Sequence, residues 1–257
     1  MPSLRPLPAL RDNYIWMLAE AASGCALVVD PGEAAPVLHA LAEDGRTLSA
    51  ILLTHHHADH IGGTAELLRR WPGIPIFAPN DDRIDLPCQR VGRGSRVQVR
   101  DWGFDVMEIP GHTSSHIAFV GHGHLFCGDT LFSLGCGRLF EGTPAQMLAS
   151  LDALATLPMD TLVCCGHEYT VANAAFAEVV DPQNAALRER SLAAAGMRSA
   201  GRATLPSMLG DELAANPFLR VDSDPVRHAV AGHLGHAPRD RAECFAGLRA
   251  WKDGFRA

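Results

Sequence analysis

The sequence contains almost no lysine: Lys252 is the single lysine among 22 basic residues, which are scattered along the chain. A nucleic-acid-binding domain usually has a net positive charge and gathers its lysines and arginines into a patch. This chain instead has a formal net charge of −7 and no basic run. We therefore expect no nucleic-acid partner, although a local basic pocket can still bind a small anionic substrate.

Long apolar runs are also absent. No run reaches about 18 apolar residues, the length that indicates a helix crossing a bilayer, and residues 1–6 lack the apolar core of a secretory signal peptide. The seven cysteines include no C-x-x-C pair, and an odd, unpatterned set is typical of reduced thiols in a cytosol. We therefore expect a cytoplasmic protein with no membrane partner.

The composition and hydrophobic pattern of the sequence change along its 257 residues. Short β-like runs alternate with helical segments up to about Tyr169, and alanine, leucine, arginine and glutamate dominate afterwards. We predict an α/β protein with one domain at 1–169 and a helical domain at 170–257. Strands are expected at 13–18, 25–30, 50–54, 74–78, 97–99, 104–109, 117–120, 125–127 and 162–165. Helices are expected at 33–42, 63–71, 144–157, 171–179, 184–195, 209–214 and 239–253, with Thr143 as an N-cap.

Four potential metal ligands follow one predicted strand within six positions: His55, His57, Asp59 and His60. Alternate side chains of an extended segment point the same way, so His55 and His57 can converge on one ion. Asp59 and His60 come where the chain turns toward a helix and can reach a second ion. Imidazole and carboxylate groups are ligands that Zn²⁺ and related metals accept. An accidental surface cluster of histidines is the less favoured alternative.

Three later strand ends repeat this pattern, each with a glycine directly before the potential ligand. The ligands are His112, Asp129 and His167, and glycine lets the backbone turn closely at such points. Together, five histidines and two aspartates can hold two ions and leave coordination positions for water, as catalytic sites require. We expect two divalent ions, with Zn²⁺ favoured and iron or manganese also compatible with these ligands.

The H-x-H-x-D-H motif and the later ligands are accompanied by further motifs spread over nearly the whole chain. With them, the sequence resembles the glyoxalase II (hydroxyacylglutathione hydrolase) family of the metallo-β-lactamase superfamily. The resemblance implies an αββα metallo-β-lactamase-type sandwich as the catalytic domain and a C-terminal helical domain that binds the substrate. The further motifs are Asp12-Asn13-Tyr14, 54–63, 110–116, 128–132, 135–138, 166–170, Asn216-Pro217-Phe218 and 249–255.

The resemblance also implies a role for each ligand and a reaction. It assigns His55, His57 and His112 to the first metal, Asp59, His60 and His167 to the second, and Asp129 to a bridge between them. The implied reaction is hydrolysis of S-D-lactoylglutathione to D-lactate and glutathione, the second step of methylglyoxal detoxification. Two adjacent metals lower the pKa of a shared water, and Asp59 is expected to orient the resulting hydroxide. His116 matches no ligand position, and we expect it to pack beside the ligands.

The predicted helix 239–253 carries three cations on its apolar face. At about 100° per residue, this face holds Arg241, Ala242, Phe245, Leu248, Arg249 and Lys252. Arg249 and Lys252 are three residues apart and repel each other, which indicates an anionic partner. Long side chains that reach past a packed helix to solvent are the alternative.

The resemblance favours an anionic partner, because it assigns Arg249 and Lys252 to the glycine carboxylate of glutathione. It assigns Tyr169 to the same peptide. Arg138 stands where the family commonly has lysine, and it remains a candidate substrate contact. Phe140 stands where many members have tyrosine, so one hydroxyl donor is lost.

Several other activities remain open on this scaffold, since a fold does not fix a reaction. The alternatives are a lactonase or β-lactamase, a persulfide dioxygenase with a single iron, a phosphodiesterase or nuclease, and an inactive metal-binding module. A serine hydrolase is disfavoured because the sequence has no G-x-S-x-G motif. The expected partner is a small-molecule glutathione thioester, and we expect a monomer.

Overall fold

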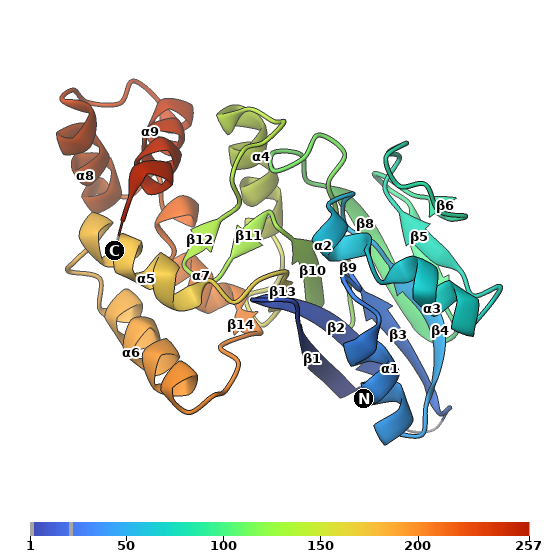
Figure 1. Cartoon of the computed structure of the whole chain (residues 1–257). Coiled ribbons are helices and arrows are strands. Elements are labelled where there is room, and N and C mark those ends of the chain that lie inside the picture. The colour runs from blue at the N-terminus through green and yellow to red at the C-terminus, as the bar shows by residue number, and fades with distance from the viewer. Residues whose placement is uncertain (1–2, 21–22, 257) are drawn as a thin grey trace. The chain divides into compact units, whose positions relative to one another are not determined.

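The computed structural model describes residues 3–20 and 23–256, which form two compact units (Figure 1). Unit 1 contains the described residues of 1–108 together with 115–128. Unit 2 contains segment 109–114 and the chain from Asp129 onward. Residues 1 and 2, part of the start that we expect not to be a signal peptide, lie outside the described ranges.

Unit 1 is built around a six-stranded sheet in the order β1-β2-β3-β4-β5-β6. The β1–β2 and β2–β3 pairs are antiparallel, whereas the other three pairs are parallel. One face of this sheet packs against α1 and α3 through a core of apolar side chains. The strands are Ser3–Ala9, Asn13–Ala19, Cys25–Val29, Thr47–Leu52, Ile76–Ala78 and Gln89–Arg90. The helices are α1 Ala35–Glu43, α2 Ala58–Ile61 and α3 Thr64–Arg70.

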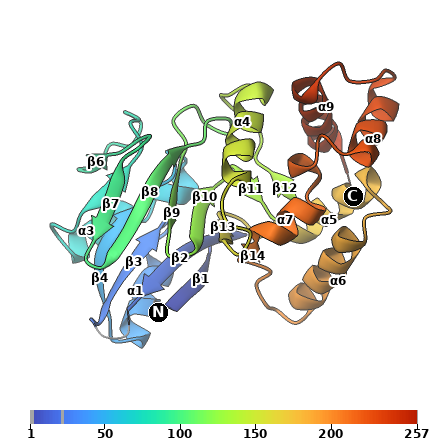
Figure 2. The ribbon, with the colours of Figure 1, turned by 180° about the vertical axis from the view of Figure 1, so that it is seen from behind.

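The second sheet of unit 1 contains the antiparallel strands β7, β8, β9 and β10. Figures 1 and 2 show these strands on the side of the first sheet that faces away from α1 and α3. All seven residues of β2 are buried, as expected for a strand covered on both faces. Unit 1 therefore has three layers: helices, sheet and sheet. The strands are Arg96–Val99, Trp102–Glu108, Ile117–Gly121 and His124–Gly128.

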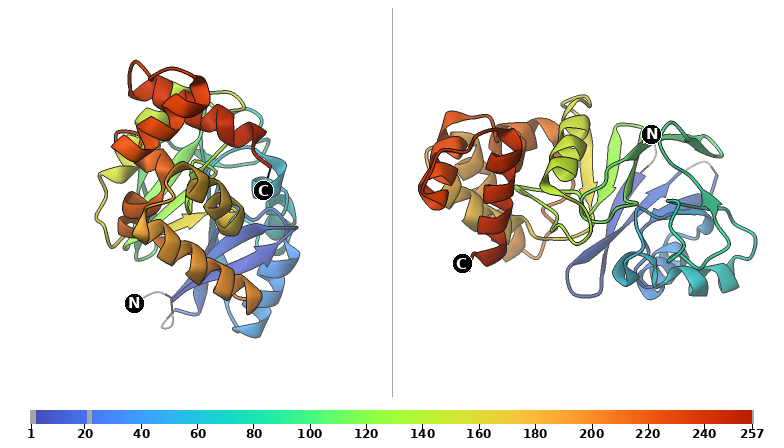
Figure 3. Two further views of the ribbon diagram at one scale, coloured as in Figure 1. Left: turned by 90° about the vertical axis from the view of Figure 1, so that its left-hand side faces the viewer. Right: turned by 90° about the horizontal axis from the view of Figure 1, so that it is seen from above.

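Unit 2 is mainly helical and carries two short pairs of strands. A hairpin joins β11 to β12, and β13 pairs with β14 in antiparallel fashion. Helix α9 packs against α4 and α8, and Figure 3 shows the unit's helices from two further directions. The strands are Leu131–Phe132, Gly135–Cys136, Leu162–Cys165 and Ser207–Met208. The helices are α4 Pro144–Ala155, α5 Thr170–Val180, α6 Ala185–Ser199, α7 Leu209–Ala215, η1 Pro217–Leu219, α8 Asp224–Leu234 and α9 Arg241–Gly254.

The expected elements are present, with small shifts at their ends, and Thr143 caps α4 as predicted by accepting from the backbone N–H of Gln146. The sequence analysis did not predict β1 and α8, nor the short elements α2, β6, β11, β12 and η1. Strand β1 contains Pro6 and Pro8, which weaken a strand pattern, and it is tolerated because it forms the edge of its sheet. Helix α8, Asp224–Leu234, has an amphipathic pattern with Val226 and Val230 buried, and the sequence analysis overlooked it. Strand β14 is a further difference, since we expected no strands after about Tyr169.

No helix in the described ranges is both long enough and apolar enough to cross a membrane. All seven cysteines lie in those ranges, and each is a free thiol.

Candidate metal centre

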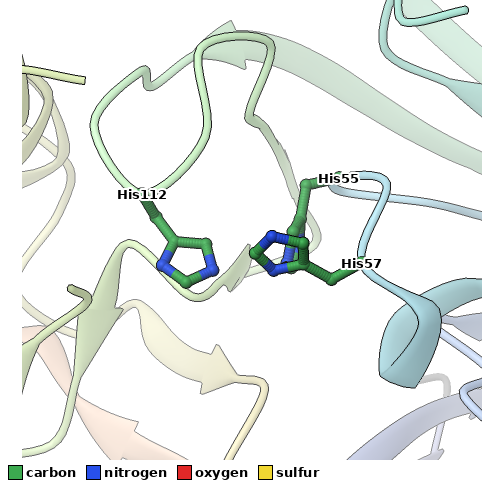
Figure 4. A group of neighbouring side chains, drawn as sticks. All are labelled: His55, His57 and His112. Carbon is green, nitrogen blue, oxygen red and sulfur yellow. The ribbon is translucent and has the colours of Figure 1, made fainter. Parts of the chain in front are cut away.

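Two imidazole rings of unit 1 lie edge to face just beyond the end of β4. His55 is fully buried and His57 is half-buried. Their ring centroids lie 4.7 Å apart, and Nε2 of His55 lies 3.1 Å from Nδ1 of His57. Figure 4 shows both side chains leaving the same loop with their rings adjacent. Two imidazole nitrogens at this spacing can bind one metal ion together.

Asp30, which directly follows β3, orients His55 through Thr54 and orients His60 directly. Its two carboxylate oxygens accept from the backbone N–H and the hydroxyl of Thr54, over 2.8 and 2.7 Å. Because the Thr54 proton goes to Asp30, the hydroxyl oxygen accepts from Nδ1 of His55 over 3.0 Å. Nδ1 of His60 donates to the same carboxylate over 3.0 Å. In both His55 and His60, Nε2 is therefore the nitrogen that carries a lone pair for a metal.

Asp59 and His60 lie on α2, the single helical turn that follows His57. Oδ2 of Asp59 lies 3.6 Å from Nε2 of His60. The amide of Asn13 donates to the side chain and to the backbone oxygen of Asp59, over 3.1 and 3.2 Å. The Asp12-Asn13-Tyr14 motif thus has a physical role, because Asn13 holds a potential ligand in place.

His116 is buried and stacks on His55, with ring centroids 4.5 Å apart and planes inclined by 18°. This contact matches the packing role that we expected for His116. Gly128 lies against the same group with φ +47°, and a Cβ there would come within 2.4 Å of Oγ1 of Thr54. Glycine is required at position 128 because a side chain would displace the groups that orient His55.

The remaining histidine of the motif, His56, points to a different carboxylate. Its Nδ1 lies 3.3 Å from Oδ2 of Asp81, which also accepts from the hydroxyl of Ser115. Arg83 forms a bidentate ion pair with Asp81. Hydrogen bonds from Arg83 and Ser115 hold the pKa of Asp81 well below its usual range, against the effect of burial. Asp81 is therefore an anchor for the histidine loop, and His56 is outside the potential ligand set.

Unit 2 supplies three further potential ligands at loop positions. The ring of His112, labelled in Figure 4, donates from Nδ1 to the carbonyl oxygen of Arg138 over 2.9 Å. Its Nε2 therefore carries the lone pair. Oδ2 of Asp129 lies 3.5 Å from Nε2 of His112 and 3.3 Å from Nε2 of His167. One carboxylate oxygen thus lies near the reactive nitrogens of two histidines.

Gly137 permits this arrangement, because a Cβ at that position would come within 1.9 Å of the carbonyl oxygen of Asp129. Glycine also precedes His112, His167 and Asp129, as noted in the sequence.

Two aromatic rings, those of Tyr169 and Phe132, contact His167. Tyr169 stacks on it with ring centroids 4.7 Å apart and planes inclined by 6°. Phe132 makes edge contacts with both rings, at centroid distances of 5.9 and 5.2 Å. The exposed Tyr169 thus lies directly beside a potential metal ligand.

Arg249 is 5% exposed and is held by three groups of unit 2. Its Nη1 donates to the carbonyl oxygen of Cys136 over 2.7 Å, and its Nη2 donates to Asp253 over 3.1 Å. The guanidinium also lies 5.2 Å from the ring of Phe218. The buried cation thus has an anionic partner within its own helix, where the sequence analysis expected a ligand.

Lys252 lies one turn further along α9. Its Nζ donates to the carbonyl oxygen of Ala172 over 3.0 Å and lies 5.3 Å from the ring of Phe176 and 5.7 Å from that of Phe255. Burial, followed by repulsion from Arg249, lowers the pKa of Lys252 to about 8. An anion beside Lys252 would offset both effects.

The other cations singled out in the sequence differ from these two. The side chain of Arg138 is 62% exposed and lies 3.6 Å from Asp253. Arg241 points outward to Asp152 and Asp222, so it belongs to a surface ion-pair cluster and not to the inward face of α9. Phe140 is 63% exposed, and its ring lies 5.1 Å from that of His112.

Within unit 1, the structure brings His55, His57, Asp59 and His60 together, and within unit 2 it brings His112, Asp129 and His167 together. The donors are imidazole nitrogens and carboxylate oxygens, a set suited to a divalent metal. Asp30, His55 and His60 also offer donor atoms within 4.8 Å of one another. Sequence reasoning missed the orienting role of Asp30, although this carboxylate directly follows a predicted strand and precedes Pro31-Gly32.

Comparison with known protein families gives two matches that cover most of the chain. Residues 11–167 match the model of the metallo-beta-lactamase superfamily, and residues 168–255 match the model described as "Hydroxyacylglutathione hydrolase C-terminus". A hydroxyacylglutathione hydrolase of Xanthomonas axonopodis pv. citri is 59% identical over 251 residues, which cover 98% of both chains. One from Xylella fastidiosa strain M23 is 56% identical over 252 residues, covering 98% of this chain and 97% of the relative.

Solved structures share the fold. ETHE1 from Myxococcus xanthus aligns with a TM-score of 0.65 and 24% identity over 98% of this chain and 99% of that chain. The BLEG-1 B3 metallo-beta-lactamase aligns with a TM-score of 0.63 and 23% identity over 85% of this chain and 99% of that chain. TTHA1623, solved in a di-iron-bound form, aligns with a TM-score of 0.55 and 29% identity over 63% of this chain and 91% of that chain. The expected metallo-β-lactamase fold is thereby confirmed.

Proposed function

The chain belongs to the hydroxyacylglutathione hydrolase family of the metallo-β-lactamase superfamily, and from this premise we propose that it hydrolyses S-D-lactoylglutathione to D-lactate and glutathione. This reaction is the second step of methylglyoxal detoxification. The observation that carries the proposal is the pair of neighbouring cations on α9, the buried Arg249 and the half-buried Lys252. Metal ligands are common to the whole superfamily, whereas this pair suits a carboxylate of a glutathione thioester.

We assign the seven potential ligands as the family resemblance implies. His55, His57 and His112 would hold a first metal, and Asp59, His60 and His167 a second, with Asp129 as a ligand shared by the two. The orientation of His55, His60 and His112 through their Nδ1 atoms supports this assignment, because it leaves Nε2 for the metal. We assign Zn²⁺ to both positions, with iron or manganese as the alternative metals that the same ligands accept.

When bound, two adjacent metals lower the pKa of a water and polarise the thioester carbonyl. The side chains of the chain then control where that chemistry occurs. Asp59, fixed by Asn13, orients the attacking water and accepts its proton. A C–O bond forms at the thioester carbon, and the C–S bond breaks. The thiol has an ordinary pKa of about 8.5, so the sulfur departs as a thiolate without a strong acid.

The substrate is held by its glutathione part. Arg249 and Lys252 bind the glycine carboxylate, and Tyr169 packs against the peptide beside His167. Arg138, exposed on the same unit, is a further cation for this peptide. Its planar guanidinium binds differently from the lysine that is usual in the family.

We also propose that residues 1–169 form the catalytic domain and residues 170–257 the substrate-binding domain. The ranges matched by the two family models, 11–167 and 168–255, support this division. We expect a cytoplasmic monomer whose partner is a small thioester, with neither nucleic acid nor membrane as a ligand. The net charge of −7 is the reason that we expect no nucleic-acid ligand.

The test is steady-state hydrolysis of S-D-lactoylglutathione by the purified full-length protein, with metals per chain counted on the same sample. We expect a kcat/KM above about 10⁴ M⁻¹s⁻¹ and close to two metals per chain. Lactones, β-lactams, phosphodiesters and oxygen uptake with a glutathione persulfide serve as the comparison reactions. Two bound metals with no thioester hydrolysis would reject the substrate and direct attention to those reactions.

A further inference from the structure

Thr204 is a buried residue between α6 and β14, in a segment that none of the sequence motifs covers. Its backbone N–H and its hydroxyl donate to the two carboxylate oxygens of Glu168, over 2.8 and 2.6 Å. Its carbonyl oxygen accepts from Nη2 of Arg190 over 2.8 Å. All three polar groups of this single residue are therefore used to hold other parts of unit 2.

The first of those parts is the loop between β13 and α5. Glu168 stands between His167 and Tyr169, so its carboxylate fixes the backbone that carries both rings. The hydroxyl proton of Thr204 goes to this carboxylate. The 2.6 Å contact between Oγ1 of Thr204 and Oγ1 of Thr170 is therefore a hydrogen bond donated by Thr170. The loop is held on Thr204 at two points, Glu168 and Thr170.

The second part is the β11–β12 hairpin. Nη2 of Arg190, which donates to Thr204, also donates to the hydroxyl of Ser133 over 3.1 Å. Ser133 directly follows Phe132, whose ring contacts both His167 and Tyr169. Thr204 thus connects the β13–α5 loop to the β11–β12 hairpin. The loop carries the rings of His167 and Tyr169, and the hairpin carries the ring of Phe132 that contacts both.

We propose that Thr204 is a positioning residue that fixes His167 for metal binding and Tyr169 for substrate binding, an inference that rests on the proposed function. Thr204 contacts neither ring and acts through Glu168 and Arg190. Partners that lie behind metal ligands typically change metal affinity by about 10–100-fold when they are mutated. Small displacements of a contact residue also weaken substrate binding.

The decisive experiment compares three variants of the full-length protein: Thr204→Val, Thr204→Ser and Thr156→Val. Valine keeps the shape of threonine but removes the hydroxyl, whereas serine keeps it. Thr156 is a matched control, since its hydroxyl donates only locally, to the carbonyl oxygen of Ala153 at the exposed end of α4. The readouts are the dissociation constant of Zn²⁺ by chelator competition and the KM and kcat for S-D-lactoylglutathione.

We expect Thr204→Val to raise the dissociation constant of the more weakly bound Zn²⁺ by about tenfold and to raise KM. Thr204→Ser should restore both values to near those of the unmodified protein, and Thr156→Val should change neither. If Thr204→Val does not fold, Glu168→Gln tests the same link, because its amide group retains only one of the two acceptor oxygens.

The proposal is overturned if Thr204→Val, or Glu168→Gln in its place, binds Zn²⁺ and substrate as tightly as Thr156→Val. It is also overturned if serine fails to rescue the loss, because the hydroxyl then plays no part. An unmodified protein that binds Zn²⁺ but does not hydrolyse the thioester rejects the proposed function instead. In that case the Zn²⁺ affinities of the variants still decide whether Thr204 positions His167.

Discussion

At the level of single residues, the group bound to Nδ1 decides which imidazole nitrogen presents a lone pair. The partners are the Thr54 hydroxyl for His55, the Asp30 carboxylate for His60 and the Arg138 carbonyl for His112. Each proposed ligand of this group therefore needs a second residue that itself binds no metal. Such partners explain why an H-x-H-x-D-H motif alone does not define a competent centre.

A pH dependence follows from Lys252, whose pKa burial lowers to about 8. A lysine with a lowered pKa loses its charge as the pH rises through that value. We therefore expect KM for S-D-lactoylglutathione to rise about tenfold between pH 7 and 9.5, equivalent to roughly 1.4 kcal/mol of binding. The charged groups that face Lys252 are Arg249, Arg138 and Asp253.

The control for this prediction is Lys252→Arg, because a guanidinium stays protonated throughout this range. KM of that variant should stay level from pH 7 to 9.5, measured with correction for spontaneous thioester hydrolysis. A parallel rise of KM in both proteins would assign the effect to a different group.

At the level of elements, the β11–β12 hairpin is too short to be stable through its own strand pairing, and buried polar side chains hold it in place. Each of its strands has two residues, which is too short for independent stability. Glu212 accepts from the backbone N–H of Leu134 over 2.7 Å, and Asn173 donates to the carbonyl oxygen of Ser133 over 3.1 Å. Burial raises the pKa of Glu212. The hairpin's position thus depends on helices α5 and α7.

Asn216 makes the sharpest test of this dependence. Its amide donates to the carbonyl oxygens of Phe132 and Gly135, and its side-chain oxygen accepts from the backbone N–H of Phe218. Asn216→Ala leaves three buried backbone groups without these partners, at about 1–3 kcal/mol for each group. We expect a loss of roughly 3 kcal/mol or more in the free energy of unfolding, measured by urea denaturation.

Thr143→Ala provides the comparison for Asn216→Ala, because it removes an exposed N-cap of α4 at a cost of about 1 kcal/mol. A loss for Asn216→Ala no larger than that of Thr143→Ala would mean that the hairpin is supported mainly by apolar packing.

At the level of the whole molecule, the sequence predicted most elements and the residue types of the proposed site. Strand β13 at Leu162–Cys165 matches the expected range, and Thr143 is the expected cap. Such features are local, because they depend on periodicity and on neighbours within a few positions. Thr204 is different: its partners lie 14 and 36 residues away, so no local pattern marks it. Contacts that the fold creates between distant segments are outside the reach of sequence patterns.

Removal of metal should destabilise the whole protein. A ligand present at 1,000 times its dissociation constant stabilises the native state by about 4.1 kcal/mol. For a chain of this size, about 1 kcal/mol corresponds to roughly 2–4 °C in Tm. We therefore expect dialysis against a chelator to lower Tm by about 10 °C and to abolish thioester hydrolysis, and added Zn²⁺ to restore both.

Dialysis against the same buffer without chelator is the control for metal removal. An unchanged Tm after complete loss of metal would mean that metal binding does not stabilise the folded protein, and would contradict this prediction.

Segment 109–114 belongs to unit 2 although unit 1 flanks it in sequence. Its backbone is tied into unit 2 by the hydroxyl of Ser150, which donates to the carbonyl oxygen of Pro110, and by the N–H groups of Phe140 and Gly142. The chain consequently passes from one unit to the other after Glu108, after Ser114 and after Gly128. No single cut in the coding sequence would therefore separate the two units. A split version of the protein for fragment complementation would therefore need its junction inside one unit, in an exposed loop such as the one after α6.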